Sequence, residues 1–220
     1  WRASRLALER DGLMKAQARA LLEAAAGRTL SVMFPMVSEP WEFDEARAIF
    51  ERQREWIAKQ GRATPTRIRY GTMLEVPALA ETLDMILPKL DFLSIGTNDL
   101  TQFLFAADRA NPKLAERYDW LSPAILRFIR RVTRECQAAD VPVTICGEMG
   151  GRTLDAMALI GIGIERLSIT PAAIAPVKAM VRSLNICDTK EIIETLLAHP
   201  PADIRATLIK WAREKNVEIV

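Results

Sequence analysis

The sequence predicts an α/β protein in which helices cover a mostly parallel sheet. Five short apolar segments lack the polar alternation of strands with one exposed face, and segments of helical periodicity follow them in turn. Half of the 220 residues are apolar, which is enough for one sizeable core. Five strands leave two architectures open: an open sheet, or a (β/α)8 barrel that lacks its N-terminal strands.

The first helix is expected over residues 11–27, where apolar residues recur at helical spacing and Gly27 suits a left-handed C-cap. A nearly continuous apolar run at residues 31–37 predicts a strand buried on both faces. Ser38 as N-cap and Pro40 in the first turn then predict a long helix that ends at Gly61.

The same alternation continues through the rest of the chain. Four further strands are predicted at residues 69–75, 92–96, 141–146 and 167–170. Four helices are predicted at residues 77–87, 99–107, 124–138 and 153–159. The tail from Thr189 onward also has a helical pattern, which Pro200 and Pro201 interrupt.

Composition excludes several classes of partner. A net charge of +2, with acidic and basic residues interleaved, argues against nucleic acid and against an anionic membrane surface. No apolar run is long enough to span a bilayer, and no signal peptide is visible. The three cysteines, Cys136, Cys146 and Cys187, are unevenly spaced, which fits reduced thiols. We therefore expect a cytoplasmic protein.

Polar side chains stand at the ends of three consecutive predicted strands: Glu75, then Asn98 with Asp99, then Cys146. Because the carboxyl ends of parallel strands meet at one edge, these groups are expected to converge. Two carboxylates beside an amide make an open oxygen-ligand site suited to Mg²⁺, which keeps several waters and accepts phosphate oxygens. Each acid taken alone is better explained as a helix cap, whereas the pair on neighbouring strand ends favours a metal.

Groups suited to an anion lie at the same place. Gly96 permits close approach to the backbone, and the N–H groups that open the helix after Asn98 suit a phosphate. Arg109, just beyond that helix, would be a second, bidentate anchor. Taken alone, Arg109 is explained as a solvated surface residue, and nothing local marks Arg2.

Cys146 lies between an apolar strand and a turn of small residues, which leaves room for a substrate beside the sulfur. Three interpretations of Cys146 fit this position: a nucleophile, a proton carrier and an inert buried thiol. The sole histidine, His199, lies far from any strand end, which weakens the nucleophile interpretation. With a reference pKa of about 8.5, a thiol is a reasonable acid for protonating an enolate. No dinucleotide glycine fingerprint or Walker loop is present.

Four segments resemble the phosphoenolpyruvate-utilising enzymes: residues 73–77 (MLEVP), 91–103 (DFLSIGTNDLTQF), 108–111 (DRAN) and 146–148 (CGE). Within that family the chain is similar to the phosphotransferase-system branch (Enzyme I), and residues 103–109 and 167–173 resemble its nitrogen-related form. The resemblance covers nearly the whole chain. It implies a (β/α)8 barrel, usually dimeric, that binds phosphoenolpyruvate and Mg²⁺ and passes the phosphoryl group to a histidine on a separate domain.

The resemblance also implies a role for each candidate. The acids Glu75 and Asp99 would hold the metal, and Cys146 would protonate the enolate to give pyruvate. The phosphate-binding set would be Arg2, Asn98 and Arg109. These roles agree with the chemistry, since phosphoryl transfer mainly needs positioning and charge neutralisation.

The resemblance leaves two parts of the family unmatched: the first barrel strands, with two further substrate arginines, and the domain with the phosphorylated histidine. Since the chain also begins at Trp1 rather than Met, we expect residues 1–220 to be the C-terminal portion of a phosphoenolpyruvate-binding barrel domain. It would be inactive alone and would reach a phosphocarrier protein only through the missing histidine domain. The alternatives are a pyruvate phosphate dikinase or phosphoenolpyruvate synthase fragment, and a non-catalytic dimerisation module.

Overall fold

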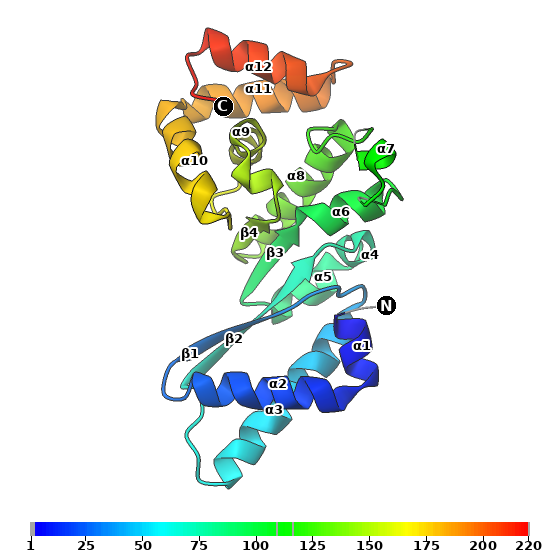
Figure 1. The fold of residues 1–220 in the computed structure, drawn as a ribbon, viewed down its shortest axis with the longest axis vertical. Helices are drawn as coiled ribbons and strands as arrows, with labels where there is room; N and C mark the ends of the chain where they lie inside the picture. Colours follow the sequence, from blue (N-terminus) through cyan, green and yellow to red (C-terminus); the bar gives the residue numbers. More distant parts are fainter. Residues whose placement is uncertain (1–2, 109, 116, 220) are drawn as a thin grey trace. The chain divides into compact units, whose positions relative to one another are not determined.

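The computed structural model describes residues 3–108, 110–115 and 117–219. The chain divides into two compact units, Trp1–Ser94 and Ile95–Val220. Helices and strands of both units are drawn in Figure 1.

A four-stranded parallel sheet confirms the predicted fold class. The hydrogen-bonded order is β1-β2-β3-β4, so each strand lies beside the next one in sequence. The strands are β1 (Thr29–Phe34), β2 (Arg67–Leu74), β3 (Phe92–Gly96) and β4 (Val143–Cys146). In the first unit β1 and β2 pair in parallel from Thr29↔Arg67 to Phe34↔Thr72. The barrel is not closed by these strands, which suits the predicted partial barrel.

The prediction of a fifth strand at residues 167–170 is wrong. Within the described residues this segment is reduced to a single parallel bridge between Ile145 and Leu167. The Ser168 N–H still donates to the Ile145 carbonyl at 2.8 Å. The chain leaves the sheet because the next helix begins at Pro171, whose ring nitrogen cannot donate to a ladder.

The first unit contains helices that follow or precede its strands. They are α1 (Ser4–Glu9), α2 (Asp11–Ala24), α3 (Pro40–Lys59), α4 (Pro77–Ala80), α5 (Leu83–Ile86) and the 3₁₀ turn η1 (Leu87–Lys89). The N-cap of α3 is Glu39, one residue beyond the predicted Ser38. Glu39 and Glu42 form a capping box, and the Ser38 N–H donates to Glu42 Oε2 at 2.6 Å.

The helix predicted at residues 77–87 is broken at Thr82, which has φ −127° and ψ 25°. The Thr82 hydroxyl donates to the carbonyl of Leu79 at 3.2 Å. Such local side-chain bonds compete with helix continuation, and a β-branched residue gives little helix propensity to resist them. Two short helices and a 3₁₀ turn therefore replace one long helix.

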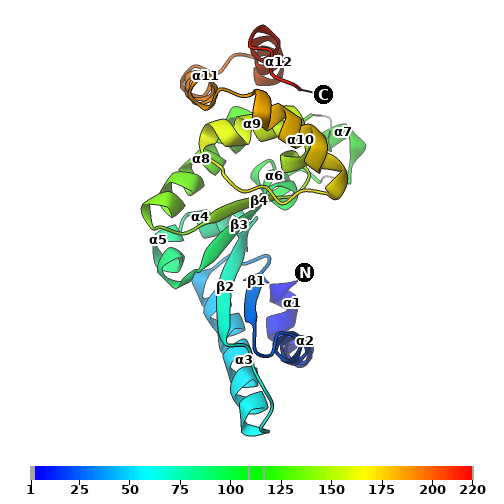
Figure 2. The same ribbon diagram turned by 90° about the vertical axis from the view of Figure 1, so that its left-hand side faces the viewer.

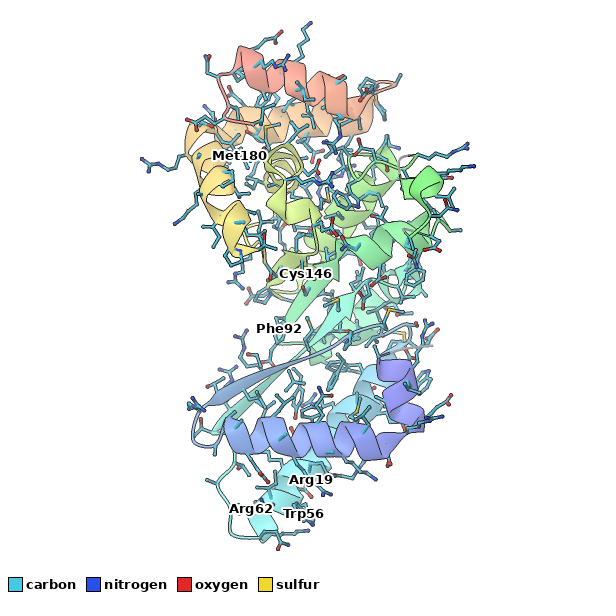
Figure 3. All side chains as sticks on the ribbon, in the orientation of Figure 1. Arg19, Trp56, Arg62, Phe92, Cys146 and Met180 are labelled. Carbon is cyan, nitrogen blue, oxygen red and sulfur yellow. The ribbon has the colours of Figure 1, made fainter. Side chains whose placement is uncertain are left out.

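In the first unit α2 and α3 are joined at Trp56 of α3, whose ring is contacted by the guanidinium groups of Arg19 and Arg62 (Figure 3). Arg19 of α2 lies 4.3 Å from the Trp56 ring centroid, and Arg62 lies 5.3 Å from it. Arg19 Nε also donates to Gln53 Oε1 of α3 at 2.6 Å. These cation–π contacts and the hydrogen bond fix the helix pair, so Trp56 is structural despite being 40% exposed.

The second unit is mainly helical. Its helices are α6 (Thr97–Leu104), α7 (Pro112–Ala115), α8 (Pro123–Ala138), η2 (Met149–Gly151, 3₁₀), α9 (Thr153–Ile162), α10 (Pro171–Ser183), α11 (Ile186–Ala198) and α12 (Ile204–Glu214). Helices α7 and α10 were not among the predicted elements. Thr170 followed by Pro171 is a typical helix start, but Pro176 in the interior of α10 interrupts the pattern by which a helix is recognised in the sequence.

Helix α9 is the centre of the second unit, because nearly all of its residues are buried. At Gly161 the neighbouring helix α11 comes so close that a Cβ would lie 2.5 Å from Ile193 Cγ1 and 3.0 Å from the Thr189 carbonyl. Helices α11 and α12 lie side by side in both ribbon views (Figures 1 and 2). Small residues thus allow the C-terminal helices to cover α9.

Candidate functional site

The ends of β3 and β4 meet in the second unit, where Asn98 and Glu148 bind each other. Gly96 ends β3 and α6 begins at Thr97, so Asn98 lies in the first turn of α6. Its Nδ2 donates to Glu148 Oε1 at 3.4 Å, and the Glu148 N–H donates to Asn98 Oδ1 at 3.2 Å. Two bonds in opposite directions fix both the position and the amide orientation of Asn98.

Gly147 makes this close approach possible. Its φ of +100° lies in the region that residues with a side chain rarely adopt. A Cβ there would lie 2.5 Å from Thr97 Oγ1 and 3.1 Å from Asn98 Oδ1. The glycine is therefore required both for the turn after β4 and for the space that Asn98 occupies.

Cys146 is the last residue of β4 and is half-buried (Figure 3). Its Sγ donates to the Ile95 carbonyl at 3.4 Å, and its own carbonyl accepts from Thr97 Oγ1 at 3.1 Å. Cys146 and Asn98 are thus held at one edge of the second unit, as the strand-end argument predicts.

The two predicted metal ligands belong to different units. Glu75 follows β2 in the first unit, is only 4% exposed, and accepts the Met36 N–H at 2.8 Å through Oε1. Asp99 lies in the first turn of α6 in the second unit and is half-buried. Both side chains offer carboxylate oxygens, the donors that Mg²⁺ prefers. Their meeting at one ion stays a prediction.

Two candidates, Arg2 and Arg109, lie outside the described residues. Asp108 is described, and its Oδ1 accepts the Ala110 N–H at 2.9 Å. Across the described part of the chain, no three His, Cys, Asp or Glu side chains form a group able to hold a metal.

A cavity of about 400 Å³ in the second unit lies against this edge. Its lining includes Asn98 and Glu148 as well as residues that the sequence did not mark. The polar and aromatic residues outside the segments marked by the sequence are Tyr118, Asp119, Trp120, Arg152 and Arg205. Gln102 and Glu148 lie within marked segments, 91–103 and 146–148, but neither was assigned a role from the sequence. The volume of the cavity suits a small metabolite.

A sequence model of the PEP-utilising enzymes, described as their PEP-binding domain, matches residues 1–186. The chain belongs to this PEP-utilising family. The resemblance inferred from the strand-end segments is therefore confirmed.

Curated relatives of this PEP-utilising chain are phosphotransferases by name. The phosphoenolpyruvate-protein phosphotransferase of Haemophilus influenzae is 35% identical over 202 residues, which is 92% of the chain and 35% of the relative. The protein of the same name from Bacillus subtilis is 36% identical over 90% of the chain and 35% of its own length. A Salmonella typhimurium protein named "phosphoenolpyruvate-dependent phosphotransferase system" is 39% identical over 99% of the chain and 29% of its own length. The chain thus spans about a third of these relatives.

A solved structure supports the fold. A citrate lyase from Burkholderia xenovorans superposes with a TM-score of 0.55 at 18% identity, covering 94% of the chain and 70% of that protein. At that identity the likeness concerns the α/β fold alone. Among the described residues, no helix has the length and apolar character needed to cross a membrane.

Proposed function

We propose that the chain is the phosphoenolpyruvate-binding part of a phosphotransferase, the C-terminal portion of a barrel domain spanning residues 1–220. The enzyme would move the phosphoryl group of phosphoenolpyruvate to a histidine on another domain and release pyruvate. The observation that carries the proposal is the fixed arrangement of Asn98, Glu148 and Cys146 at the ends of β3 and β4. Membership of the PEP-utilising family supports phosphoenolpyruvate as the ligand of that arrangement.

In this proposal separate residues bind the metal and the phosphate. Glu75 and Asp99 would hold Mg²⁺, which when bound neutralises charge on the phosphoryl oxygens. Asn98 would donate an amide N–H to the phosphate, and its orientation is already set by Glu148. The remaining phosphate ligands would be Arg2 and Arg109.

Cys146 would supply the proton. When the phosphoryl group has passed to the accepting histidine, the enolate that is left takes the S–H proton on carbon and becomes pyruvate. The thiolate then regains a proton from water. The S–H group already points to a polar acceptor, the Ile95 carbonyl, so its proton is held in a defined direction.

The same proposal includes the partners. The phosphoryl group would pass from the histidine domain to a phosphocarrier protein, the enzyme would act as a homodimer, and both would be in the cytoplasm. No part of these steps needs nucleic acid or a membrane.

Calorimetry with phosphoenolpyruvate and Mg²⁺ tests the binding part of the proposal in the 220-residue chain. We expect saturable uptake that Glu75→Gln abolishes, because glutamine keeps an acceptor for the Met36 N–H but removes the charge that the metal needs. Glu45→Gln, an exposed acid on α3 of the same unit, is the matched control. A chain that forms a concentration-dependent dimer without taking up ligand would be a dimerisation module instead.

Turnover tests the proton donor. In the full-length protein Cys146→Ala should stop pyruvate formation and leave phosphoenolpyruvate binding largely intact. Unchanged turnover in that variant would reject the role of Cys146. Formation of pyruvate that requires a nucleotide would point to the dikinase or synthase alternative.

A further inference from the structure

The cavity of the second unit carries an arginine to which neither sequence nor family assigns a role. Arg152 follows η2, and it lines the same cavity as Asn98 and Glu148. Its backbone is fixed at the start of α9, since its N–H donates to the Met149 carbonyl at 3.3 Å and its carbonyl accepts the Ala156 N–H at 2.8 Å. The guanidinium group therefore extends from a rigid turn into the cavity wall.

The ring of Trp120, another residue of the cavity lining, supports this guanidinium. The Arg152 Cζ lies 4.4 Å from the centroid of the Trp120 ring, a cation–π contact. A guanidinium that rests on an aromatic ring through its face keeps its N–H groups at the edge for other acceptors. The stacking thus orients the donors and still leaves them available to a ligand.

The segment that carries Trp120 is itself held in place. Arg205 of α12 binds Asp119 through two bonds, Nε to Oδ2 at 2.5 Å and Nη2 to Oδ1 at 2.7 Å. The Leu121 N–H also donates to Asp119 Oδ1 at 2.9 Å. Trp120 stands between these two anchored residues, so the support beneath Arg152 is preorganised.

The acids of the cavity wall already have hydrogen-bond partners, whereas Arg152, in the part of the chain that the structure describes, contacts a ring and no carboxylate directly. Asp119 is paired with Arg205, Glu148 with Asn98, and Asp108 with the Ala110 N–H. Among the residues described, no carboxylate lies within ion-pair distance of the Arg152 guanidinium. Asp119 and Asp155 act on Arg152 only through their charge, without a direct ion pair, so its N–H groups can still donate to an anion in the cavity.

We propose that Arg152 is a further anion-binding residue of this cavity and takes the carboxylate or phosphate group of a small acid by bidentate hydrogen bonds. The proposal rests on the proposed function, because phosphoenolpyruvate carries both groups. It extends that function by adding a ligand contact from the start of α9.

The test measures binding to the 220-residue chain by calorimetry, with phosphoenolpyruvate, inorganic phosphate and pyruvate as separate probes. We expect Arg152→Gln to weaken phosphoenolpyruvate binding at least tenfold, and Arg152→Lys to restore little of it, because an ammonium lacks the planar fork. The matched control is Arg131→Gln, which removes an arginine that also lies over an aromatic ring, Phe128, but outside the cavity lining. Thermal unfolding checks that every variant is folded.

The two smaller probes identify which anionic group Arg152 binds: Arg152-dependent binding of pyruvate indicates the carboxylate, and of inorganic phosphate the phosphate. If phosphoenolpyruvate binds with unchanged affinity in Arg152→Gln, the inference is overturned while the proposed function stands. If phosphoenolpyruvate fails to bind but one smaller anion binds in an Arg152-dependent way, the inference stands and the proposed function fails. Absence of binding by all three probes overturns the inference.

Discussion

Arg205 Nη2 lies 2.7 Å from Oδ1 of Asp155, a carboxylate with no exposed surface. This ion pair joins α12 to the buried helix α9. Burial raises the pKa of the Asp155 carboxyl, and Arg205 opposes that rise. For Asp119 burial also acts to raise the pKa, but the hydrogen bonds from Arg205 and the Leu121 N–H, together with the charges of Arg205 and Arg152, outweigh it and hold the pKa below its usual value. One arginine therefore compensates two carboxylates of the second unit.

Replacing Arg205 should destabilise the second unit strongly. Arg205→Met leaves Asp155 buried without its cation, and breaking a buried pair in this way costs about 3–5 kcal/mol. Urea unfolding followed by circular dichroism measures the loss. Lys210→Met, which alters an 80% exposed side chain on the same helix, should change stability little. Adding Asp155→Asn to Arg205→Met should recover part of the loss, and a double variant no more stable than the single one would contradict this account.

Alkaline pH should weaken the fold through Cys136. Burial raises the pKa of this thiol from its ordinary value of 9.0 to about 12, with a smaller contribution from the charge of Glu135. Below pH 9 the Cys136 thiol is protonated in both the folded and the unfolded chain, and its contribution to stability is fully present. Between pH 9 and about 12 the unfolded chain loses the thiol proton while the folded chain keeps it, so the free energy of unfolding falls as the pH rises. We expect Cys136→Ala to show a shallower loss of stability over that interval than wild type. Cys187→Ala, at an exposed thiol, should follow the wild-type slope.

Gly147→Ala should disturb the candidate site more than its size suggests. The new Cβ would meet Thr97 and Asn98 in a backbone conformation with φ +100°, so we expect a loss of about 1–3 kcal/mol. Displacement of Asn98 should also weaken phosphoenolpyruvate binding. Gly12→Ala is the matched control, because nothing lies within 4 Å of its Cβ and its helix should gain about 0.5–1 kcal/mol. Equal behaviour of the two variants would refute the packing argument.

Gly161→Ala should separate helix propensity from packing. Alanine favours an isolated helix by about 1 kcal/mol, but here the methyl group would overlap Ile193 of α11. Overpacking of this kind costs about 1–3 kcal/mol, so we expect a net loss and a lower thermal midpoint. A higher midpoint would show that α11 can move away without penalty. Gly161→Ala with Ile193→Val tests the overlap directly, since the shorter side chain should restore stability.

The strand ends could be predicted because their signal is local. An apolar run followed by a polar helix start marks the ends of β3 and β4, and parallel pairing then brings Asn98 and Cys146 together. Caps and breaks were less certain, because a single side-chain hydrogen bond decides them, as at Glu39 and Thr82.

The charged part of the cavity could not be predicted from sequence. Arg205 binds Asp155 across 50 residues and Asp119 across 86, and no local pattern pairs residues at such separations. Arg152 gave no signal either, because its importance depends on the Trp120 ring that lies against it. Residues whose role comes from tertiary partners need coordinates.

The contact between Arg205 and Asp155 bears on where this protein can be shortened. The family match ends at residue 186, the first residue of α11, so a chain trimmed to that boundary would lose Arg205 and expose the face of α9 that Ile193 covers. Such a product should be recovered mainly in inclusion bodies. Expression boundaries are better drawn after α12, near residue 217, where the Val217 N–H donates to the Ala212 carbonyl at 2.8 Å and closes the last helix.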